Sequence, residues 1–498
     1  MAAPSAGRRP FVSRPDRRRR APTALPETWA VVLAAGEGKR MRSGRPKILH
    51  SLGGRPLVHY PVALARGAGV AGTVIVVAPG AAAVRAALAD LAPRFVEQPE
   101  PRGTGHALLQ ARPAIPDTAA ELLLLYGDVP LLTPETLAAL LARHRARRAA
   151  ATVLTFVPAD PHGYGRVLRG RDGQVRAIVE ERDATPAQRR VGECNSGIYC
   201  FAPRWLWPAL EGLARRTPKN AQAEIYLTDV IGQLRRQGRR VEAVGVADPQ
   251  EVAGVNDRRQ LARLEGLLRG RILDALMAAG VAVVDPAATY VDATVTVGRD
   301  TTLHPGVRLA GRTVLGEGCV IGTGCQVVDT TLGDRVTLRP YCVLDASRVE
   351  ADATLGPFAR LRPGTLIERG ADIGNFIEIK QATIGPGVKA HHVGYIGDAT
   401  VGEGANIGAG VITANYDGTR KHRTRIGARA FVGTNASLVA PLTIGDDAYV
   451  GAGSVITKDV PSGALAVERA PQLVKEGWTE RRRARAPASD GPPGAAAP

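Results

Sequence analysis

Large apolar residues recur at every sixth position through much of the C-terminal half of the chain. They form three unbroken series: Val291, Val297, Leu303, Leu309, Leu315, Ile321 and Val327; Leu355, Leu361, Ile367, Ile373 and Ile379; and Ile426, Val432, Leu438, Ile444, Val450 and Ile456. A small residue follows many of them four positions later, at Cys319, Cys325, Cys342, Ala359, Ala430, Ala436, Ala448 and Ser454. So short a unit cannot bury its apolar face alone, and stacking must supply the core. The pattern predicts a parallel β-helix of hexapeptide repeats, and it excludes a coiled coil, whose spacing alternates three and four.

Two segments with polar side chains are expected to interrupt this repeat. They are Lys389–Tyr395 and Asn415–Arg423, and the second has no inward apolar residue. Binding and catalytic residues concentrate on loops that a rigid scaffold positions. His392 is a candidate general base, because imidazole titrates near neutral pH. Taken alone, a structural histidine is the alternative.

The pattern changes to alternating strands and helices in the N-terminal half. Strands are predicted at Trp29–Leu33, Thr73–Val77 and Glu121–Leu125, and a helix at Gly80–Leu91. This alternation is typical of a Rossmann-like α/β domain with a parallel sheet. A further helical pattern runs from Asn256 to Gly280, with apolar positions on one face at Leu261, Leu264, Leu268, Ile272 and Leu276. At 1.5 Å per residue such a connecting helix spans roughly 35 Å.

A glycine-rich turn follows the first predicted strand. Gly36 and Gly38 lie in it, with Arg40 and Lys47 shortly after. Backbone N–H groups in such a turn bind anions, and the two cations suit a triphosphate. The spacing matches neither the P-loop nor the dinucleotide fingerprint. A turn without any ligand remains the alternative.

Asp128 stands where the strand Glu121–Leu125 ends. Ligands of open parallel sheets bind at the carboxyl ends of the strands. Mg²⁺ prefers one or two carboxylates together with substrate phosphates, so Asp128 is a candidate magnesium ligand. A turn or helix-capping aspartate is an equally good interpretation of the residue in isolation.

Composition narrows the functional class. The chain has 498 residues, 45% hydrophobic residues and five cysteines without a CxxC pair, which argues against a zinc site or a disulfide framework and fits a reducing cytoplasm. No apolar run has transmembrane length. The net charge of +18 is partly terminal, with +5 in residues 1–28 and +2 in residues 478–498, and no basic stripe is interleaved with aromatic residues. Nucleic-acid binding is therefore an unfavoured alternative, and a phosphate-bearing substrate suits the charge equally well.

Four N-terminal motifs resemble the sugar-nucleotide pyrophosphorylase fold. They are Leu33–Gly36 with Arg40 and Lys47, Gly103–Ala107, Tyr126–Pro130 and Gly163–Arg166. With the repeat region, they resemble the family of bifunctional N-acetylglucosamine-1-phosphate uridylyltransferases/glucosamine-1-phosphate N-acetyltransferases, from about Trp29 to Trp478. The resemblance implies five segments: a basic disordered extension (1–28), a uridylyltransferase domain (29–255), a linker helix (256–281), a left-handed β-helix acetyltransferase domain (282–460) and a partly disordered tail (461–498).

The resemblance also implies the residues of the uridylyl transfer site. Arg40 and Lys47 would be catalytic, and Asp128 and Asn256 would hold Mg²⁺, although Asn256 could instead cap the helix that it precedes. The nucleotide and the sugar phosphate would contact Leu33, Ala34, Ala35, Gly36, Lys47, Gln98, Gly103, Thr104, Tyr126, Gly127, Asp128, Gly165, Glu180, Asn195 and Asn256. Pro101 and Arg102 depart from the Gln-Leu pair of the family, which removes one amide hydrogen bond near the base.

For acetyl transfer, the resemblance selects His392 as the general base through the pattern Lys-x-x-His-x-x-Tyr. Glucosamine 1-phosphate would contact Arg360, Lys380, Tyr395 and Asn406. Acetyl-CoA would contact Ala409, Asn415, Tyr416, Thr434, Ala452 and Arg469, with the N–H of Ala409 as a candidate oxyanion donor.

The resemblance implies a cytoplasmic homotrimer that uses glucosamine 1-phosphate, acetyl-CoA and UTP. It would make UDP-N-acetylglucosamine for cell-envelope precursors such as peptidoglycan and lipopolysaccharide. One rival interpretation is a single-function nucleotidyltransferase whose β-helix only holds subunits together. A basic scaffold or nucleic-acid-binding protein is the second rival.

Overall fold

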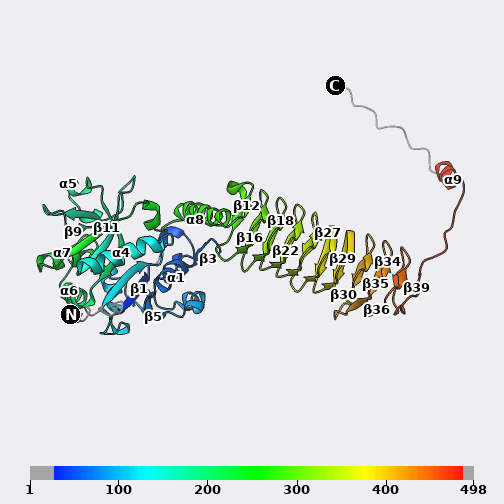
Figure 1. Cartoon of the computed structure of the whole chain (residues 1–498), viewed down its shortest axis with the longest axis horizontal. Coiled ribbons are helices and arrows are strands. Elements are labelled where there is room, and N and C mark those ends of the chain that lie inside the picture. The colour runs from blue at the N-terminus through cyan, green and yellow to red at the C-terminus, as the bar shows by residue number, and fades with distance from the viewer. Residues whose placement is uncertain (1–26, 37, 219, 486–498) are drawn as a thin grey trace, which may run out of the picture. The chain divides into compact units, whose positions relative to one another are not determined.

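The computed structural model describes residues 27–36, 38–218 and 220–485, and these form two compact units that divide after Leu268 (Figure 1). The predicted basic extension lies outside the described residues except for its last two positions. The part of the predicted tail after residue 485 also lies outside them.

The first unit is built on a nine-stranded sheet with β1 near its centre. The strand order is β11-β7-β10-β6-β1-β4-β5, and β8 and β9 join through β10. Strand β1 pairs in parallel with β4 and β6, whereas β10 is antiparallel to β6 and β7. The strands are β1 Thr28–Ala34, β4 Gly72–Val77, β5 Arg94–Glu97, β6 Glu121–Tyr126, β7 Ala151–Phe156, β8 Arg166–Arg169, β9 Val175–Val179, β10 Cys194–Phe201 and β11 Val241–Gly245.

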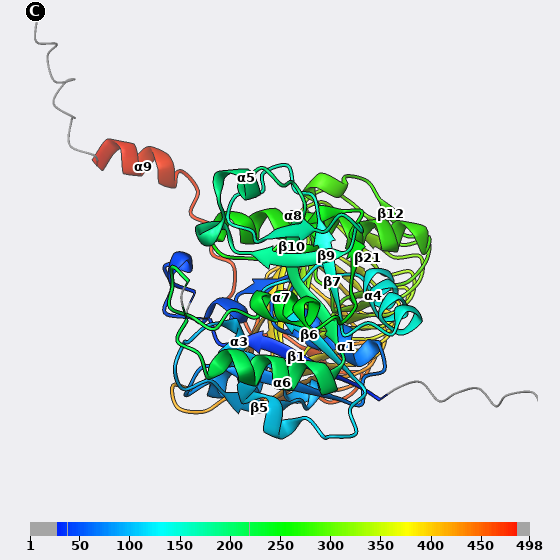
Figure 2. The ribbon, with the colours of Figure 1, turned by 90° about the vertical axis from the view of Figure 1, so that its left-hand side faces the viewer.

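Helices cover both faces of this sheet (Figure 2). Trp29, Val31 and Leu33 of β1 lie in one core with α3, α6 and α7, while the alternate residues of β1 lie in a second core with α1, α2 and α4. Burial on both faces explains why the strand reads as a continuous apolar run. The helices are α1 His59–Gly67, α2 Ala82–Ala87, α3 Thr104–Gln110, α4 Pro134–Arg147, α5 Pro186–Arg189, α6 Pro203–Ala214 and α7 Thr228–Arg236.

The predicted helix Gly80–Leu91 is shorter in the structure. Helix α2 ends at Ala87, and Leu88 leaves the helical conformation with φ −121° and ψ 15° before a single 3₁₀ turn at Ala89–Leu91. The Leu88 side chain is fully buried. The helix thus ends where the Leu88 side chain is buried in the core, and the local sequence pattern did not indicate this end.

The second unit is a parallel β-helix. Most strands pair with the strand three ahead, as β15 does with β18, β16 with β19 and β17 with β20, so successive strands occupy three faces. Around the long strands β27 and β29 the partner is the strand two ahead. One sheet of nineteen strands, from β12 (Ala282–Val283) to β39 (Leu465–Ala466), covers two faces, and a sheet of nine covers the third. All members of the three apolar series are at most 8% exposed, and the small residues that follow them are at most 1% exposed. The fold class predicted for both units is confirmed.

One of the two predicted interruptions is not an interruption. Lys389–Gly397 forms the continuous strand β29, which pairs with β27 (Asp372–Lys380) and buries Ala390 and Ile396. These two residues keep the six-residue phase, but Ala390 is too small to have been recognised as an inward position. The predicted break at Lys389–Tyr395 was therefore wrong, although its polar residues do face outward.

The second interruption is confirmed. Residues 415–423 leave the coil between β32 (Ile412–Ala414) and β33 (Thr424–Ile426). Thr400 pairs with Arg425, 25 positions later, whereas Thr383 pairs with Thr400, 17 positions later. The extra residues form a projecting loop that is closed by a bridge between Tyr416 and Lys421.

Helix α8 (Arg258–Ala278) contains the division between the units. Leu264 lies in a small core of the first unit with Met41, Leu52, Leu57, Leu131 and Val255. Leu273 lies in the core of the β-helix, and Ile272 and Leu276 pack against that core. In the described part of the chain, no helix has both the length and the apolar character needed to span a bilayer.

Candidate active sites

A cavity of about 290 Å³ opens where β1 and β6 end in the first unit. The cavity is lined by ten of the residues predicted to bind nucleotide or metal: Leu33, Ala34, Ala35, Gly36, Lys47, Gln98, Gly103, Thr104, Tyr126 and Asp128. Gly127 lies beneath them, where its N–H donates to the carbonyl of Leu33. The parallel pairing of β1 with β6 brings these distant segments together.

Gly38 of the glycine-rich turn lies against Lys47, which lines this cavity. It has φ +65°, and a Cβ atom placed there would lie 2.6 Å from Cβ of Lys47. Only glycine adopts this conformation readily and leaves room for the lysine stem.

Four polar side chains from three distant segments converge beside the cavity. The Lys47 ammonium lies 2.5 Å from Oδ2 of Asp128 and 3.5 Å from Oδ1 of Asn256. Arg40 donates from Nη2 to the same Asn256 oxygen at 2.9 Å. Asp128 and Asn256 thus direct oxygen atoms toward one cationic group.

The carboxylate and carboxamide oxygens of this pair are the hard donors that Mg²⁺ prefers, so the residues fit that ion. Within the described residues, no group of three or more His, Cys, Asp or Glu side chains is arranged to hold a metal by itself. A cation held by Asp128 and Asn256 would therefore complete its coordination with oxygens of water or substrate.

The structure excludes the helix-capping interpretation of Asp128 and Asn256, whereas Asp128 does lie in the turn that follows β6. Asp257, not Asn256, caps α8, since its Oδ1 accepts from the N–H of Gln260 at 2.8 Å. Gln260 in return accepts from the backbone N–H of Asn256 at 2.7 Å. Thr133 caps the helix that follows Asp128. Neither side chain is used as a cap, and both are directed at Lys47.

A second cavity, of about 270 Å³, shares Thr104 and Tyr126 with the first. It is lined by the predicted sugar-phosphate residues Gly165, Glu180 and Asn195, and by residues that sequence analysis missed, among them Tyr199, Gln222, Glu224, Tyr226 and Thr228. Gln222, Glu224 and Tyr226 lie in an irregular segment that carries no motif, and Thr228 is the first residue of α7. We call the first the nucleotide cavity and the second the sugar cavity, after the predicted residues that line each.

Burial raises the pKa of two side chains that line the sugar cavity, Glu180 and Tyr126. It raises the pKa of Glu180, whose Oε1 accepts from the Thr228 hydroxyl at 3.0 Å. Burial, and then the charges of Glu180 and Asp128, also raise the pKa of Tyr126, which keeps its hydroxyl protonated. Asn195 accepts from Gly197 N–H and from the Tyr199 hydroxyl through Oδ1. Its Oδ1 is thereby fixed, and the Nδ2 group is oriented by the same contacts.

Gln98 lines the same cavity as Pro101, one of the two residues that depart from the family pattern. Its Nε2 donates to the carbonyl of Gly103 at 3.3 Å and lies 3.1 Å from Nδ1 of His106. Pro101 lines the nucleotide cavity directly. Since proline has no N–H and no polar side chain, Gln98 is the amide that remains at this end of the cavity.

In the second unit, four predicted residues stack along one corner of the β-helix. His392, Ala409, Thr434 and Ala452 occupy corresponding positions of successive turns. Backbone hydrogen bonds fix this alignment, from Gly410 to Val393 (2.6 Å), from Asn435 to Ala409 (2.7 Å) and from Gly453 to Thr434 (2.8 Å). Arg469 extends the row, because its Nη1 donates to the carbonyl of Ala452 at 3.0 Å. The corner therefore forms a track that begins at His392.

His392 is exposed, and its Nδ1 lies 3.2 Å from Oδ1 of Asn375 in the preceding turn. The two residues are directly paired in the β27–β29 register. Asn375 is a functional neighbour that sequence analysis missed. The signal was its position 17 residues before His392, which is the length of one turn.

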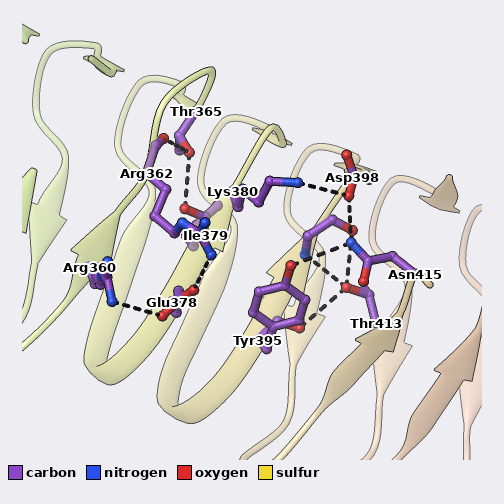
Figure 3. A network of polar contacts seen from close by, with 11 residues as sticks. Arg360, Arg362, Thr365, Glu378, Ile379, Lys380, Tyr395, Asp398, Thr413 and Asn415 are labelled. Carbon is purple, nitrogen blue, oxygen red and sulfur yellow. Dashed lines mark hydrogen bonds and ion pairs between the residues drawn. The ribbon is translucent and has the colours of Figure 1, made fainter. Parts of the chain in front are cut away.

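A cluster of charged groups lies on the next face, around the end of β29 (Figure 3). Asp398 accepts from Lys380 at 3.4 Å and from Nδ2 of Asn415 at 2.5 Å, and Asn415 also lies 3.4 Å from the Tyr395 hydroxyl. Lys421 on the projecting loop adds a second ammonium, and the neighbouring Lys380 lowers the pKa of Lys421. The structure thus brings Lys380, Tyr395 and Asn415 together around the Asp398 carboxylate.

Arg360 forms an ion pair with Glu378, a residue that was not predicted for this site. Glu378 lies 3.6 Å from Nη1 of Arg360 and 2.9 Å from Nη1 of Arg362 (Figure 3). Arg362 and Lys380 both follow an inward residue by one position, whereas Arg360 precedes one. The repeat phase therefore places Arg362, rather than Arg360, on the row of Lys380.

Asn406 and Tyr416 are not brought to this cluster. Asn406 pairs with Lys389 on the neighbouring face, at the opposite end of β29 from Tyr395. Tyr416 is 60% exposed, and its hydroxyl donates to Gly418 within the projecting loop. Within one chain, the residues predicted to hold glucosamine 1-phosphate do not all converge.

Comparison with known proteins agrees with both units. Residues 30–224 match the MobA-like NTP transferase domain family, and residues 423–458 match the bacterial transferase hexapeptide family. The curated relatives of this chain include proteins named bifunctional protein GlmU. The one from Geotalea uraniireducens is 45% identical over 91% of this chain and 99% of its own, and the one from Heliobacterium modesticaldum is 47% identical over 91% and 98%. The one from Mycobacterium tuberculosis is 46% identical over 93% and 94%. This chain therefore belongs to the family of bifunctional GlmU proteins.

Proposed function

We propose that this chain makes UDP-N-acetylglucosamine in two steps, one in each unit. The β-helix acetylates glucosamine 1-phosphate with acetyl-CoA, and the α/β unit then joins the product to UTP with release of pyrophosphate. The product supplies cell-envelope precursors. The proposal depends most on one observation, namely that Asp128 and Asn256 direct their oxygens at the same cationic group.

In the uridylyl step, the phosphate oxygen of N-acetylglucosamine 1-phosphate attacks the α-phosphorus of UTP in line, and pyrophosphate leaves. Such a reaction needs positioning and charge neutralisation, and it needs no nucleophilic side chain. Arg40 and Lys47 neutralise charge that develops on the phosphates. Asp128 and Asn256 would hold Mg²⁺, which supplies charge neutralisation at the phosphate oxygens.

The sugar cavity supports the choice of acceptor. The protonated Tyr126 hydroxyl is a donor, and the Glu180 carboxylate is an acceptor for a sugar hydroxyl. Asn195 provides a carboxamide held in a fixed orientation. This mixture of donors and acceptors in a partly dry cavity suits a sugar ring, because each buried polar group needs a partner.

In the acetyl step, Nε2 of His392 takes a proton from the glucosamine amine as the amine attacks the thioester carbonyl. The tetrahedral intermediate then expels the coenzyme A thiolate, which takes the proton that His392 removed from the amine. Asn375 holds the proton on Nδ1, which leaves Nε2 as the base. The N–H of Ala409 makes no hydrogen bond to another described residue and lies one turn beyond His392, so it is available for the oxyanion.

Acetyl-CoA is an elongated ligand, and the corner from His392 through Ala409, Thr434 and Ala452 to Arg469 is an elongated track. The cluster of Lys380, Arg362 and Lys421 lies on the adjacent face and suits the phosphate of glucosamine 1-phosphate. Three residues distinguish this proposal from a β-helix that only holds subunits together, since that role does not need His392, Asn375 or Asn415.

We propose a homotrimer in the cytoplasm. Asn406 lies apart from Lys380 and Tyr395 within one chain, so a site containing all three needs a second copy. Exposed aromatic rings of Tyr341, Phe358 and Phe376 stack at 5.3 and 5.1 Å along the β-helix, an apolar strip suited to contact between copies. All five cysteines are buried and free, which suits a reducing compartment.

One incubation tests both steps. The full chain is mixed with glucosamine 1-phosphate, acetyl-CoA, UTP and Mg²⁺, and coenzyme A and pyrophosphate are measured separately. The proposal expects both products, with pyrophosphate release dependent on acetyl-CoA. Pyrophosphate without coenzyme A would instead identify the single-function alternative. Sedimentation of the same sample tests the trimer.

A further inference from the structure

The Lys47 ammonium lies in the place where a metal bound by Asp128 and Asn256 would have to enter. It is 2.5 Å from the Asp128 carboxylate and 3.5 Å from the Asn256 carboxamide oxygen, and the Lys47 and Asp128 side chains are only 12% and 19% exposed. The second cation, Arg40, bonds the same Asn256 oxygen. Both oxygens of the candidate metal site are therefore engaged by positive groups of the chain itself.

An ammonium and a divalent cation cannot occupy this place together. Mg²⁺ binds oxygen at about 2.0–2.1 Å, well inside the space that the ammonium takes up. Two cations in contact also repel each other strongly in a partly dry site. The ammonium and an ion bound between Oδ2 of Asp128 and Oδ1 of Asn256 would need the same space, so at these two oxygens the two must alternate.

The lysine is built to move only at its tip. Its backbone starts the 3₁₀ turn Lys47–Leu49, the neighbouring Ile48 and Leu49 are buried, and Gly38 lies against its Cβ. The flexible outer part of the side chain lines the nucleotide cavity. An ammonium displaced from Asp128 would therefore still face the space for the phosphates.

We propose that Lys47 competes with the divalent cation for Asp128 and Asn256, and that metal entry transfers the lysine to the nucleotide phosphates. The inference rests on the proposed uridylyl site and adds a step that couples its two ligands. The chain alone holds the metal weakly, because the ion must first displace an internal ion pair. A triphosphate offers the displaced ammonium a new partner, so metal and nucleotide favour each other's binding.

The test measures Mn²⁺ binding to the full chain without nucleotide, by electron paramagnetic resonance of the free ion. Lys47→Met keeps the length of the side chain but removes its charge. We expect it to bind Mn²⁺ about tenfold more tightly than the unmodified chain, the order expected for loss of one competing charge-assisted hydrogen bond. Lys458→Met, on an exposed loop of the β-helix, is the matched control for the change in net charge and should bind as the unmodified chain does.

Two further variants separate the possible failures. Lys47→Arg keeps the charge, so it should keep the weak binding of the unmodified chain. Unchanged or weaker Mn²⁺ binding by Lys47→Met, or tighter binding by Lys47→Arg, would overturn the competition. Lys47→Met combined with Asp128→Ala should lose the added Mn²⁺ affinity. Retained tight binding in this double variant would show that the metal lies elsewhere, which is a failure of the proposed uridylyl site rather than of the competition alone.

Discussion

Asn375 lies one turn of the β-helix before His392 and places its Oδ1 atom 3.2 Å from the Nδ1 atom of the imidazole. The carbonyl oxygen of an amide only accepts hydrogen bonds, so this contact fixes the proton on Nδ1 and leaves the lone pair on Nε2. The strand pairing of β27 with β29 sets the relationship, because Asn375 and His392 are direct partners. The register of the coil therefore places an amide oxygen beside Nδ1 of His392.

Removing the base should separate the two activities. We expect His392→Ala to lower coenzyme A release by about 10²- to 10⁴-fold, the usual contribution of a general base. Pyrophosphate release from UTP and N-acetylglucosamine 1-phosphate should not change. Asn375→Ala should lower acetyl transfer by a smaller factor, about fivefold for one lost hydrogen bond. Full acetyl transfer by His392→Ala would remove His392 from the mechanism.

Removing the Asp128 carboxylate should stop uridylyl transfer and leave acetyl transfer intact. Asp128→Ala removes the only carboxylate of the candidate metal pair and leaves the Lys47 ammonium without its anion. We expect pyrophosphate release to fall at least 10³-fold, while acetyl transfer measured by coenzyme A release is unchanged. Asp257→Ala is the control that weakens the cap of α8 without removing a ligand. Loss of both activities by a folded Asp128→Ala protein would contradict the assignment.

Burial of Glu180 predicts how stability depends on pH. Burial raises the pKa of this carboxyl in the folded protein above its ordinary value of 4.5, so the folded state binds its proton more tightly than the unfolded state does. Stability from this group therefore falls as pH rises from 4.5 through the folded pKa. Glu180→Gln has no charge to bury, so its melting temperature should exceed that of the unmodified chain at pH 8. The gap should close at pH 4, and an equal gap at both pH values would refute the cause.

The regular parts of the fold could be predicted from sequence because they repeat. The inward residues of the coil and the first strand of the sheet follow simple periods, and burial confirmed them. The phase was lost at Ala390, where a small residue takes an inward position and β29 continues. The six-residue period identifies large inward residues, but it gives no signal where a small residue takes the inward position.

The sites were predictable only where a motif carried them. Asp128 and Asn256 came from family resemblance, and nothing in the local sequence distinguished them from caps until Thr133 and Asp257 were seen to serve as the caps. Tyr226 enters the sugar cavity from an irregular segment without a period or motif, and Thr228 enters it from the first position of α7. Arg362 was missed although the repeat phase places it on the row of Lys380. Such contacts depend on which segments the fold brings together.

Gly38 offers a test of how closely the loop is fitted to Lys47. An alanine there would place its Cβ 2.6 Å from Cβ of Lys47 and would also hold φ at +65°, a conformation that costs an L-residue about 1–2 kcal/mol. Gly80→Ala is a matched control, since Gly80 has φ +74° and no atom within 4 Å of the added Cβ. Both variants have the backbone strain, but only Gly38→Ala must displace the lysine stem. We therefore expect Gly38→Ala to lower kcat for pyrophosphate release by more than tenfold with acetyl transfer unchanged, and Gly80→Ala to retain both activities while melting at a lower temperature. Equal uridylyl activity in the two variants would mean that the position of the Lys47 stem does not limit the reaction.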